Sequence, residues 1–295
     1  ASFANVFSVN YGADGAGSTA YALKVVTAAS GLVDTATGEA VTMSVDASGN
    51  IVGKTATSGA TVFTISVSAS GVVTLDQARA VQHSDGSNAN DTVALAANSI
   101  SLTATATDKD GDSASQTVNL GAGFVFTDDA PTVTANAANA ATLTVDETTL
   151  ATNASASFAN VFSVNYGADG AGSTAYALNV VNAASGLIDT ATGQAVTMSV
   201  VNGQIVGTAG GNTVFTISVS ASGVVTLDQV RAVQHADGNN ANDTVTLAAN
   251  SISLTATATD KDGDKASQTV NLGAGFVFTD DAPTVTASGT AAATL

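Results

Sequence analysis

Polar and apolar residues alternate along much of the chain, and this pattern predicts β-strands. Residues 61–68 alternate from Thr61 onward, and residues 99–107 alternate for nine positions without a break. A period of two places one face of a strand in the core and the other toward solvent. We therefore expect half-buried strands in antiparallel sheets. Weaker strand patterns lie at residues 5–11, 21–27, 40–45, 72–75, 115–120, 124–126 and 131–134.

Turn signals separate these runs. Asn202 and Gly203 stand between apolar runs, and an Asn-Gly pair favours the type I′ turn of a tight hairpin, which needs positive φ at both central residues. The segment 75–83 has helix-like spacing, with Leu75, Ala78, Arg79 and Gln82, and predicts at most a short helical turn.

The chain contains two copies of one sequence. Residues 3–45 reappear as 158–200 with four differences, and residues 62–135 reappear as 214–287 with five. A period near 152 residues is the size of one ordinary domain. We expect a first repeat at 1–129 that lacks its opening segment, a complete second repeat at 130–282, and the opening of a third at 283–295, all taken from a longer array.

Many short strands with closely spaced turns indicate an all-β fold. We expect tandem immunoglobulin-like, Greek-key β-sandwich repeats. Such sandwiches need only about 100 residues, so each repeat should carry an extra hairpin or a second small sandwich. The chain's two prolines, Pro131 and Pro283, follow acidic pairs and suit junctions between domains, because proline fixes φ and removes a donor.

Charge changes the picture. The net charge is -17, and 22 of the 24 acidic residues are aspartate, which favours turns over strand interiors. The acids should therefore lie in loops. Nucleic acid is excluded as a partner because the chain has no basic patch, whereas cations are expected. Cysteine is absent, so no disulfide can form, and bound metal could supply stability in its place.

The sharpest motif is Asp-Lys-Asp-Gly-Asp between two predicted strands. Alternate carboxylates around a turn glycine can converge on a hard cation, and calcium accepts six to eight oxygens in flexible geometry. The alternative is a solvated hairpin tip. The motif predicts calcium ligands in both copies: Asp108, Asp110, Asp112, Asp260, Asp262 and Asp264.

A second set of acids lies at the predicted junctions. Adjacent carboxylates repel each other unless a positive charge lies between them, so a shared cation could join neighbouring repeats. The alternative is a hydrated, extended linker. The predicted ligands are Asp128, Asp129, Asp146, Glu147, Asp280 and Asp281.

Other polar motifs carry less chemistry. Turns explain the acids at Asp14, Asp169, 85–91 and 237–243, although calcium remains an alternative there. His83 and His235 are the chain's two histidines, and each is interpreted as a loop residue with a local hydrogen bond. Ser84 beside His83 is replaced by Ala236 in the second copy, so we predict that the protein is not an enzyme.

The motifs Thr105-Ala-Thr-Asp-Lys-Asp-Gly-Asp112 and Phe126-Thr-Asp-Asp-Ala-Pro131, with their copies, resemble the extender repeats of giant repeats-in-toxin (RTX) adhesins. These Lap-type biofilm adhesins of Gram-negative bacteria leave the cell by type I secretion. The resemblance implies a monomeric stalk of immunoglobulin-like domains at the cell surface, without direct membrane insertion, that projects a distal binding region. It also implies calcium at the junctions, where Asp128, Asp129, Asp280 and Asp281 match.

An alternative remains open from the sequence. The same sandwich could be a ligand-binding module of a secreted protein. Glycan sites usually need exposed aromatic residues, and the chain has four tyrosines. The threonines of residues 103–107 could order water as ice-binding surfaces do, but threonine is also common on outward strand faces.

Overall fold

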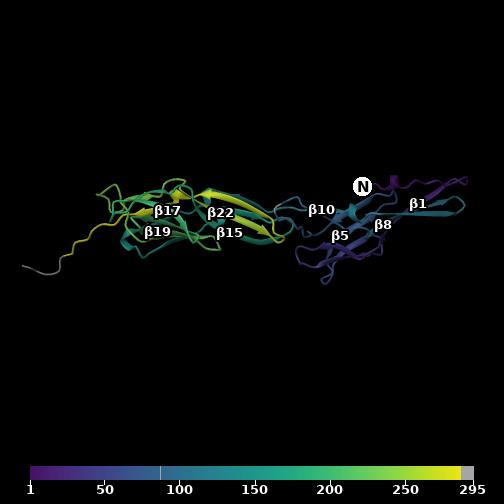
Figure 1. The fold of residues 1–295 in the computed structure, drawn as a ribbon, viewed down its shortest axis with the longest axis horizontal. Helices are drawn as coiled ribbons and strands as arrows, with labels where there is room; N and C mark the ends of the chain where they lie inside the picture. The colour runs from purple at the N-terminus through teal and green to yellow at the C-terminus, as the bar shows by residue number, and fades with distance from the viewer. Residues whose placement is uncertain (87, 287–295) are drawn as a thin grey trace, which may run out of the picture. The chain divides into compact units, whose positions relative to one another are not determined.

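A computed structural model describes residues 1–86 and 88–286, and within them the protein is all-β (Figure 1). Strands make up 52% of the structure, and the helical turns of the described residues are short 3₁₀ segments. Two of the antiparallel sheets curl into half-barrels. The all-β prediction is confirmed.

The chain forms two compact units. Unit 1 contains residues 1–132 together with two loops from the second sequence copy, 165–173 and 259–266. Unit 2 contains the remainder, 133–164, 174–258 and 267–295. The predicted limits at 129 and 282 stay a prediction, and the opening segment predicted at 283–295 lies mostly outside the described residues.

In unit 1, one sheet is an antiparallel meander of five strands in chain order. Its strands are β2 (Ala29–Val33), β3 (Ala40–Val45), β4 (Ile51–Thr55), β5 (Thr61–Val67) and β6 (Val73–Gln77). Their inward faces bury Ile51, Phe63 and Ile65 completely. Burial of such side chains is the main favourable contribution to folding.

A second sheet of unit 1 carries the acidic hairpin. Its strands lie in the order β1 (Ala16–Val25), β8 (Ile100–Asp108) and β9 (Ser113–Asn119). On β8, Ile100, Leu102 and Ala104 are buried. The alternate threonines bond to hydroxyls on β9, in pairs that include Thr103 with Thr117 at 2.8 Å. A short pair, β7 (Thr92–Ala94) and β10 (Val125–Thr127), completes the unit.

Unit 2 repeats this plan and adds strands. Its main sheet has the order β13 (Ala154–Ser157), β20 (Val224–Gln229), β19 (Asn212–Val219), β18 (Gln204–Ala209), β17 (Ala195–Val201) and β16 (Ala184–Ile188). The counterpart of the acidic-hairpin sheet consists of β15 (Ala171–Val180), β22 (Ile252–Asp260) and β23 (Lys265–Asn271). The loops at one end of these strands, 165–173 and 259–266, belong to unit 1.

The added strands of unit 2 come from the segment before the second main sheet. β12 (Leu143–Asp146) pairs in parallel with β24 (Phe276–Thr279), which also pairs with β21 (Thr244–Thr246). A further pair joins β11 (Thr132–Ala135) to β14 (Phe162–Asn165). Leu143 and Val145 are buried in the core of unit 2.

Several local predictions can be compared with these elements. Asn202 and Gly203 form the two-residue loop between β17 and β18 with φ of 49° and 79°, so the hairpin prediction is confirmed. The helical turn at 75–83 is wrong, because β6 continues to Gln77 and the next two amides, those of Ala78 and Arg79, donate to the carbonyl of Val62. The strand predicted at 5–11 is a 3₁₀ turn at Ala4–Val6 in the first copy.

Candidate metal centre

The second Asp-Lys-Asp-Gly-Asp loop folds inward on its own carboxylate. Asp260 Oδ1 accepts hydrogen bonds from the amides of Gly263 at 3.0 Å and Asp264 at 2.8 Å. Gly263 has a φ of 118°, which a residue with a side chain rarely adopts. This turn buries Asp260 and Asp264 almost completely within unit 1.

Three other carboxylates of unit 1 approach this loop. Asp128 and Asp129 follow β10, and Asp128 is buried. Asp169, also buried, lies in the loop before β15, where its Oδ1 accepts a hydrogen bond from Thr35 Oγ1 at 2.8 Å. Asp129 Oδ2 accepts from the amide of Ala168 at 3.0 Å, which places Asp129 beside Asp169.

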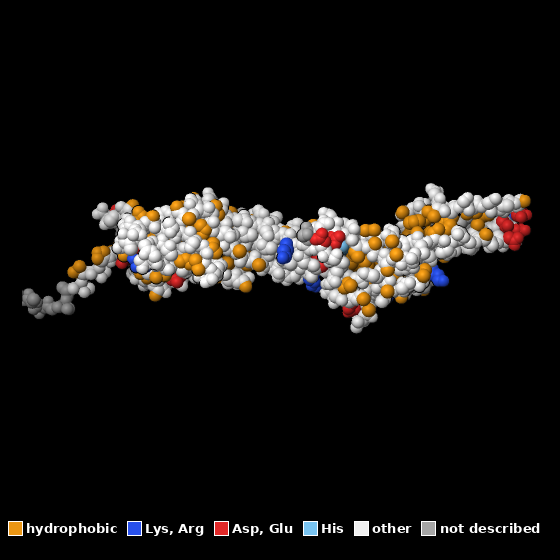
Figure 2. Space-filling view, viewed as in Figure 1, with side chains coloured by type: hydrophobic (Ala, Val, Ile, Leu, Met, Phe, Trp, Pro, Cys, Tyr) orange, Lys and Arg blue, Asp and Glu red, His pale blue; other side chains and the backbone are white. Residues whose placement is uncertain are grey.

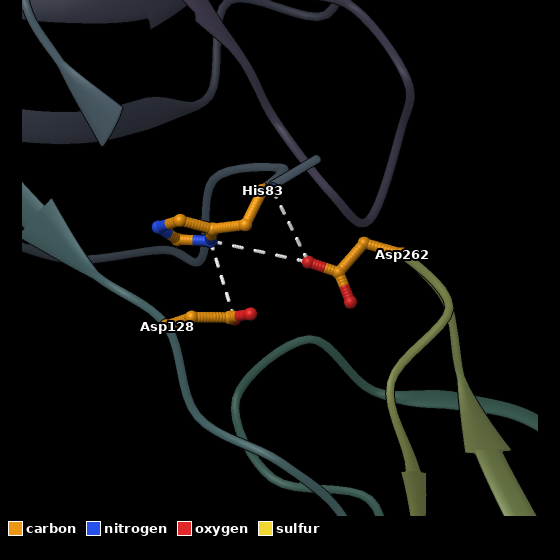
Figure 3. Close-up of side chains that lie close together, drawn as sticks. All are labelled: His83, Asp128 and Asp262. Carbon is orange, nitrogen blue, oxygen red and sulfur yellow. Dashed lines mark hydrogen bonds and ion pairs between the residues drawn. The ribbon is translucent and has the colours of Figure 1, made fainter. Parts of the chain in front are cut away.

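A histidine completes the group (Figure 3). His83 Nδ1 lies 3.2 Å from Asp128 Oδ1 and 3.9 Å from Asp262 Oδ2. The other ring nitrogen, Nε2, lies 3.3 Å from the carbonyl oxygen of Phe126. The His83 amide also donates to Asp262 Oδ2 at 3.3 Å. We call the seven residues the acidic cluster: His83, Asp128, Asp129, Asp169, Asp260, Asp262 and Asp264.

The acidic cluster is electrostatically incomplete in its protein atoms alone. Among the described residues, no lysine or arginine forms an ion pair with its carboxylates; Lys261 donates instead to the carbonyl of Ala36 at 3.3 Å. Buried polar atoms without a hydrogen-bond partner include Asp260 Oδ2, Asp262 Oδ1 and Asp264 Oδ2. Charges buried in this way need a partner or a metal.

The pKa values of three carboxylates in the acidic cluster reflect the same lack of compensating charge. Burial, followed by the contact with Asp264, raises the pKa of Asp128 to about 7. Burial also raises the pKa of Asp169 to about 6, although the hydrogen bond from Thr35 opposes this shift. For Asp260, burial and the neighbouring Asp262 raise the pKa. These carboxylates therefore resist ionisation unless a cation joins them.

The carboxylate oxygens of the acidic cluster fit calcium, and one trio adds the nitrogen of His83. Within unit 1, ligand atoms of three overlapping trios lie within 4.8 Å of one another: His83, Asp128 and Asp262; Asp128, Asp129 and Asp169; Asp260, Asp262 and Asp264. Carboxylate oxygens that converge in flexible loops are the ligands that calcium prefers. The unpartnered oxygens of the Asp260–Asp264 loop would provide such ligands.

The identical loop of the first copy lies in a different environment. Asp110 and Asp112 are exposed at the tip of the β8–β9 hairpin, where Figure 2 shows a patch of acidic side chains at the end of the hairpin. Asp108 and Asp110 form a trio with the exposed Asp14. The contact with Asp110 and the hydrogen bonds from loop amides lower the pKa of Asp108. Solvent rather than burial governs this loop.

A smaller group lies within unit 2. His235 Nδ1 lies 3.4 Å from Asp280 Oδ1, and Glu147 is close enough to both to form a trio. Glu147 Oε1 accepts hydrogen bonds from the amide of Val233 at 2.9 Å and from Gln229 Nε2 at 2.8 Å, and burial raises its pKa. The other predicted ligands of this region, Asp146 and Asp281, belong to none of the trios formed by described residues.

Sequence reasoning missed the two histidines and kept calcium only as an alternative at Asp169. His83 and His235 were interpreted as loop residues, and Asp169 as a turn former, yet all three lie in ligand trios. For Asp169 the sequence held one signal, because the acidic turn at Asp14 recurs at Asp169 in the second copy. By contrast, Asp91 accepts from the amides of Ser84, Asp85 and Thr92, as a turn residue does.

A family model matches the chain over residues 1–121 and again over 142–273, one match for each copy. The chain belongs to the DUF5801 family. This family is described as a domain of unknown function, so membership fixes the relationship and leaves the activity open. No curated protein matches the chain. Within the described residues of this DUF5801 protein, no helix has the length and apolar character needed to cross a membrane.

Proposed function

We propose that this DUF5801 chain is a pair of calcium-stabilised extender repeats from the stalk of a large bacterial cell-surface adhesin, used in adhesion and biofilm formation. One observation carries the proposal. The carboxylates of the acidic cluster bring Asp128 and Asp129 of the first sequence copy together with Asp169 and the 260–264 loop of the second. A cation bound there would link consecutive copies.

Mass action gives the size of the effect. Extracellular calcium modules have dissociation constants of about 10⁻⁴ to 10⁻³ M. Calcium at roughly 10 to 100 times that value stabilises the folded state by about 1.4 to 2.7 kcal/mol per site. In a calcium-poor cytoplasm the carboxylates of the acidic cluster repel one another, which keeps the chain easier to unfold for type I secretion.

The remaining properties follow from the resemblance to RTX adhesins. We propose an immunoglobulin-like, Greek-key sandwich fold for the repeats, a monomeric protein, and a location outside the cell. Its partners would be calcium ions and neighbouring repeats. Catalysis is not proposed, because the ring of each histidine contacts a backbone carbonyl and a carboxylate, and no serine follows His235 in the second copy.

The glycan or ice-binding alternative receives less support. The outward hydroxyls of β8 and β9 bond to each other in pairs, at 2.8 to 2.9 Å, so cross-strand stabilisation already accounts for the threonine row. We therefore retain the stalk function as the conclusion.

The experiment compares the wild-type chain with D128N/D129N and with D108N/D110N as the matched control. Calorimetric titration with calcium and small-angle scattering would be measured in calcium and in chelator. We expect calcium to narrow the distribution of interatomic distances seen by scattering in the wild type and in the control. D128N/D129N should lack this response. Equal responses in all three proteins would overturn the proposal.

A further inference from the structure

One polar atom of the acidic cluster is not explained by calcium. The side chain of His83 is 4% exposed, and its Nδ1 has no hydrogen-bond partner. It points between Asp128 and Asp262, whose side chains are 1% and 4% exposed (Figure 3). A nitrogen atom so buried, and directed at two carboxylates, requires a specific partner.

The contact of the other ring nitrogen, Nε2, shows which nitrogen carries the ring proton. A backbone carbonyl can only accept, so the 3.3 Å contact with Phe126 O places a proton on Nε2. Nδ1 is then the ring atom that faces Asp128 and Asp262, and a metal ion bound to its lone pair would link it to both carboxylates. A ring N–H held by a backbone carbonyl is also the arrangement that orients histidines bound to metals.

We propose that His83 Nδ1, Asp128 and Asp262 form a separate position for a borderline first-row transition ion such as zinc, beside the all-oxygen calcium ligands of the acidic cluster. Imidazole nitrogen suits zinc and its neighbours, whereas calcium takes oxygen. This position shares Asp128 and Asp262 with the calcium ligands and differs from them in its nitrogen, so variants of His83 and of Asp169 distinguish the two ions.

The distance to Asp128 is close to that expected for two zinc ligands, and the distance to Asp262 is longer. Zinc binds nitrogen and carboxylate oxygen at about 2.0 to 2.2 Å, so two ligands at a tetrahedral angle lie about 3.3 to 3.5 Å apart. Nδ1 lies 3.2 Å from Asp128 Oδ1 and 3.9 Å from Asp262 Oδ2. Small side-chain shifts would bring all three onto one ion.

The same construction recurs in unit 2. His235 Nε2 lies 3.2 Å from the carbonyl of Phe278, and the buried Nδ1 of His235 has no hydrogen-bond partner and lies 3.4 Å from Asp280 Oδ1. Glu147 supplies the third group there. Two units that orient the histidine by the same carbonyl contact support a common use of the free nitrogen.

Zinc binding tests the proposal on the full chain. Chelator-treated protein would be titrated with zinc chloride in saturating calcium and followed by calorimetry and by ¹⁵N NMR of the histidine ring nitrogens. In the H235Q variant, only His83 contributes these ring signals. We expect zinc to shift Nδ1 while Nε2 stays protonated. H83Q, whose amide can still donate to Phe126 O, should weaken zinc binding at this position by at least about tenfold.

Matched variants separate the two proposals. D169N should weaken calcium binding and leave the zinc stoichiometry unchanged, and H83Q should retain the calcium-dependent rise in Tm. Unaltered ring nitrogens in zinc, equal zinc binding by H83Q, or an identical Nδ1 shift in calcium alone would each overturn the zinc position. A missing calcium effect with intact zinc binding would instead overturn the proposed function.

Discussion

At the scale of single residues, one sequence has opposite properties in two places. Asp108 and Asp260 occupy the same position of identical five-residue loops. Hydrogen bonds in a solvated tip lower the pKa of Asp108, whereas burial raises that of Asp260. The difference comes from neighbours that are distant in sequence, because desolvation disfavours the charged form.

This contrast gives a matched pair of variants. In calcium, D262N should lower the stability of the protein by about 1 to 3 kcal/mol, because it removes a ligand of a stabilising ion. In chelator the same change should raise Tm, since it removes one of several buried like charges. D110N, in the exposed loop, should change Tm little under either condition. Thermal melts of the three proteins measure this, and a loss of Tm for D262N in chelator would contradict metal ligation.

The raised pKa values predict an unusual pH dependence. The pKa values of Asp128 and Asp169 rise from 3.8 to about 7 and about 6, so the folded state holds protons that the unfolded chain has released. Their contribution to stability is then complete below about pH 4 and is lost as pH rises through 6 and 7.

Metal-free protein should consequently have a higher Tm at about pH 5 than at about pH 8. Excess calcium should reverse the order, because the ionised carboxylates are the ligands. Differential scanning calorimetry in chelator and in calcium would measure both. A metal-free protein that is more stable at the higher pH would show that the carboxylates of the acidic cluster are compensated by other groups.

At the scale of elements, close packing explains glycines inside strands. Gly207 of β18 lies opposite Phe215 of β19, and a Cβ at Gly207 would overlap the phenyl ring. Gly53 and Phe63 make the same pair in unit 1. Each ring is fully buried over its glycine, so the absence of a side chain is a packing requirement.

G207A should therefore destabilise unit 2 by about 1 to 3 kcal/mol through overpacking. G238A is the control, because Gly238 is exposed and a Cβ there would contact no atom within 4 Å. Urea denaturation of the two variants would measure the difference. Equal stabilities would mean that the β18–β19 pair adjusts to the extra methyl group.

At the scale of the whole molecule, metal removal should act on specific segments. The loops 165–173 and 259–266 of unit 1 contain Asp169 and the second Asp-Lys-Asp-Gly-Asp motif. Without an ion their buried carboxylates repel, so local opening should cost less free energy.

Hydrogen exchange with mass spectrometry would test this on the intact chain. We expect chelator to accelerate exchange in 259–266, whereas 107–114, with the same motif, should exchange at nearly the same rate in calcium and in chelator. Uniform acceleration of both loops would indicate a general loss of stability instead of local ligation.

The sequence by itself determined the strongly alternating strands and the Asn-Gly hairpin. Alternation over residues 99–107 predicted β8, and Asn202-Gly203 predicted the loop between β17 and β18. Such signals are local: a period of two and a requirement for positive φ act within a few residues. The weakly alternating strands β2 and β4 were missed, because pairing with neighbouring strands stabilises them.

Tertiary structure alone decided which carboxylates meet. In the 260–264 loop Asp260 and Asp264 are buried, and Asp262 contacts His83 of the preceding copy, whereas Asp110 and Asp112 of the identical 108–112 loop are exposed. His83 became a candidate ligand through contacts with Asp128 and with Asp262, 179 positions away. Sequence fixes the donor atoms, but convergence and desolvation arise from long-range packing, and these two effects create a metal site.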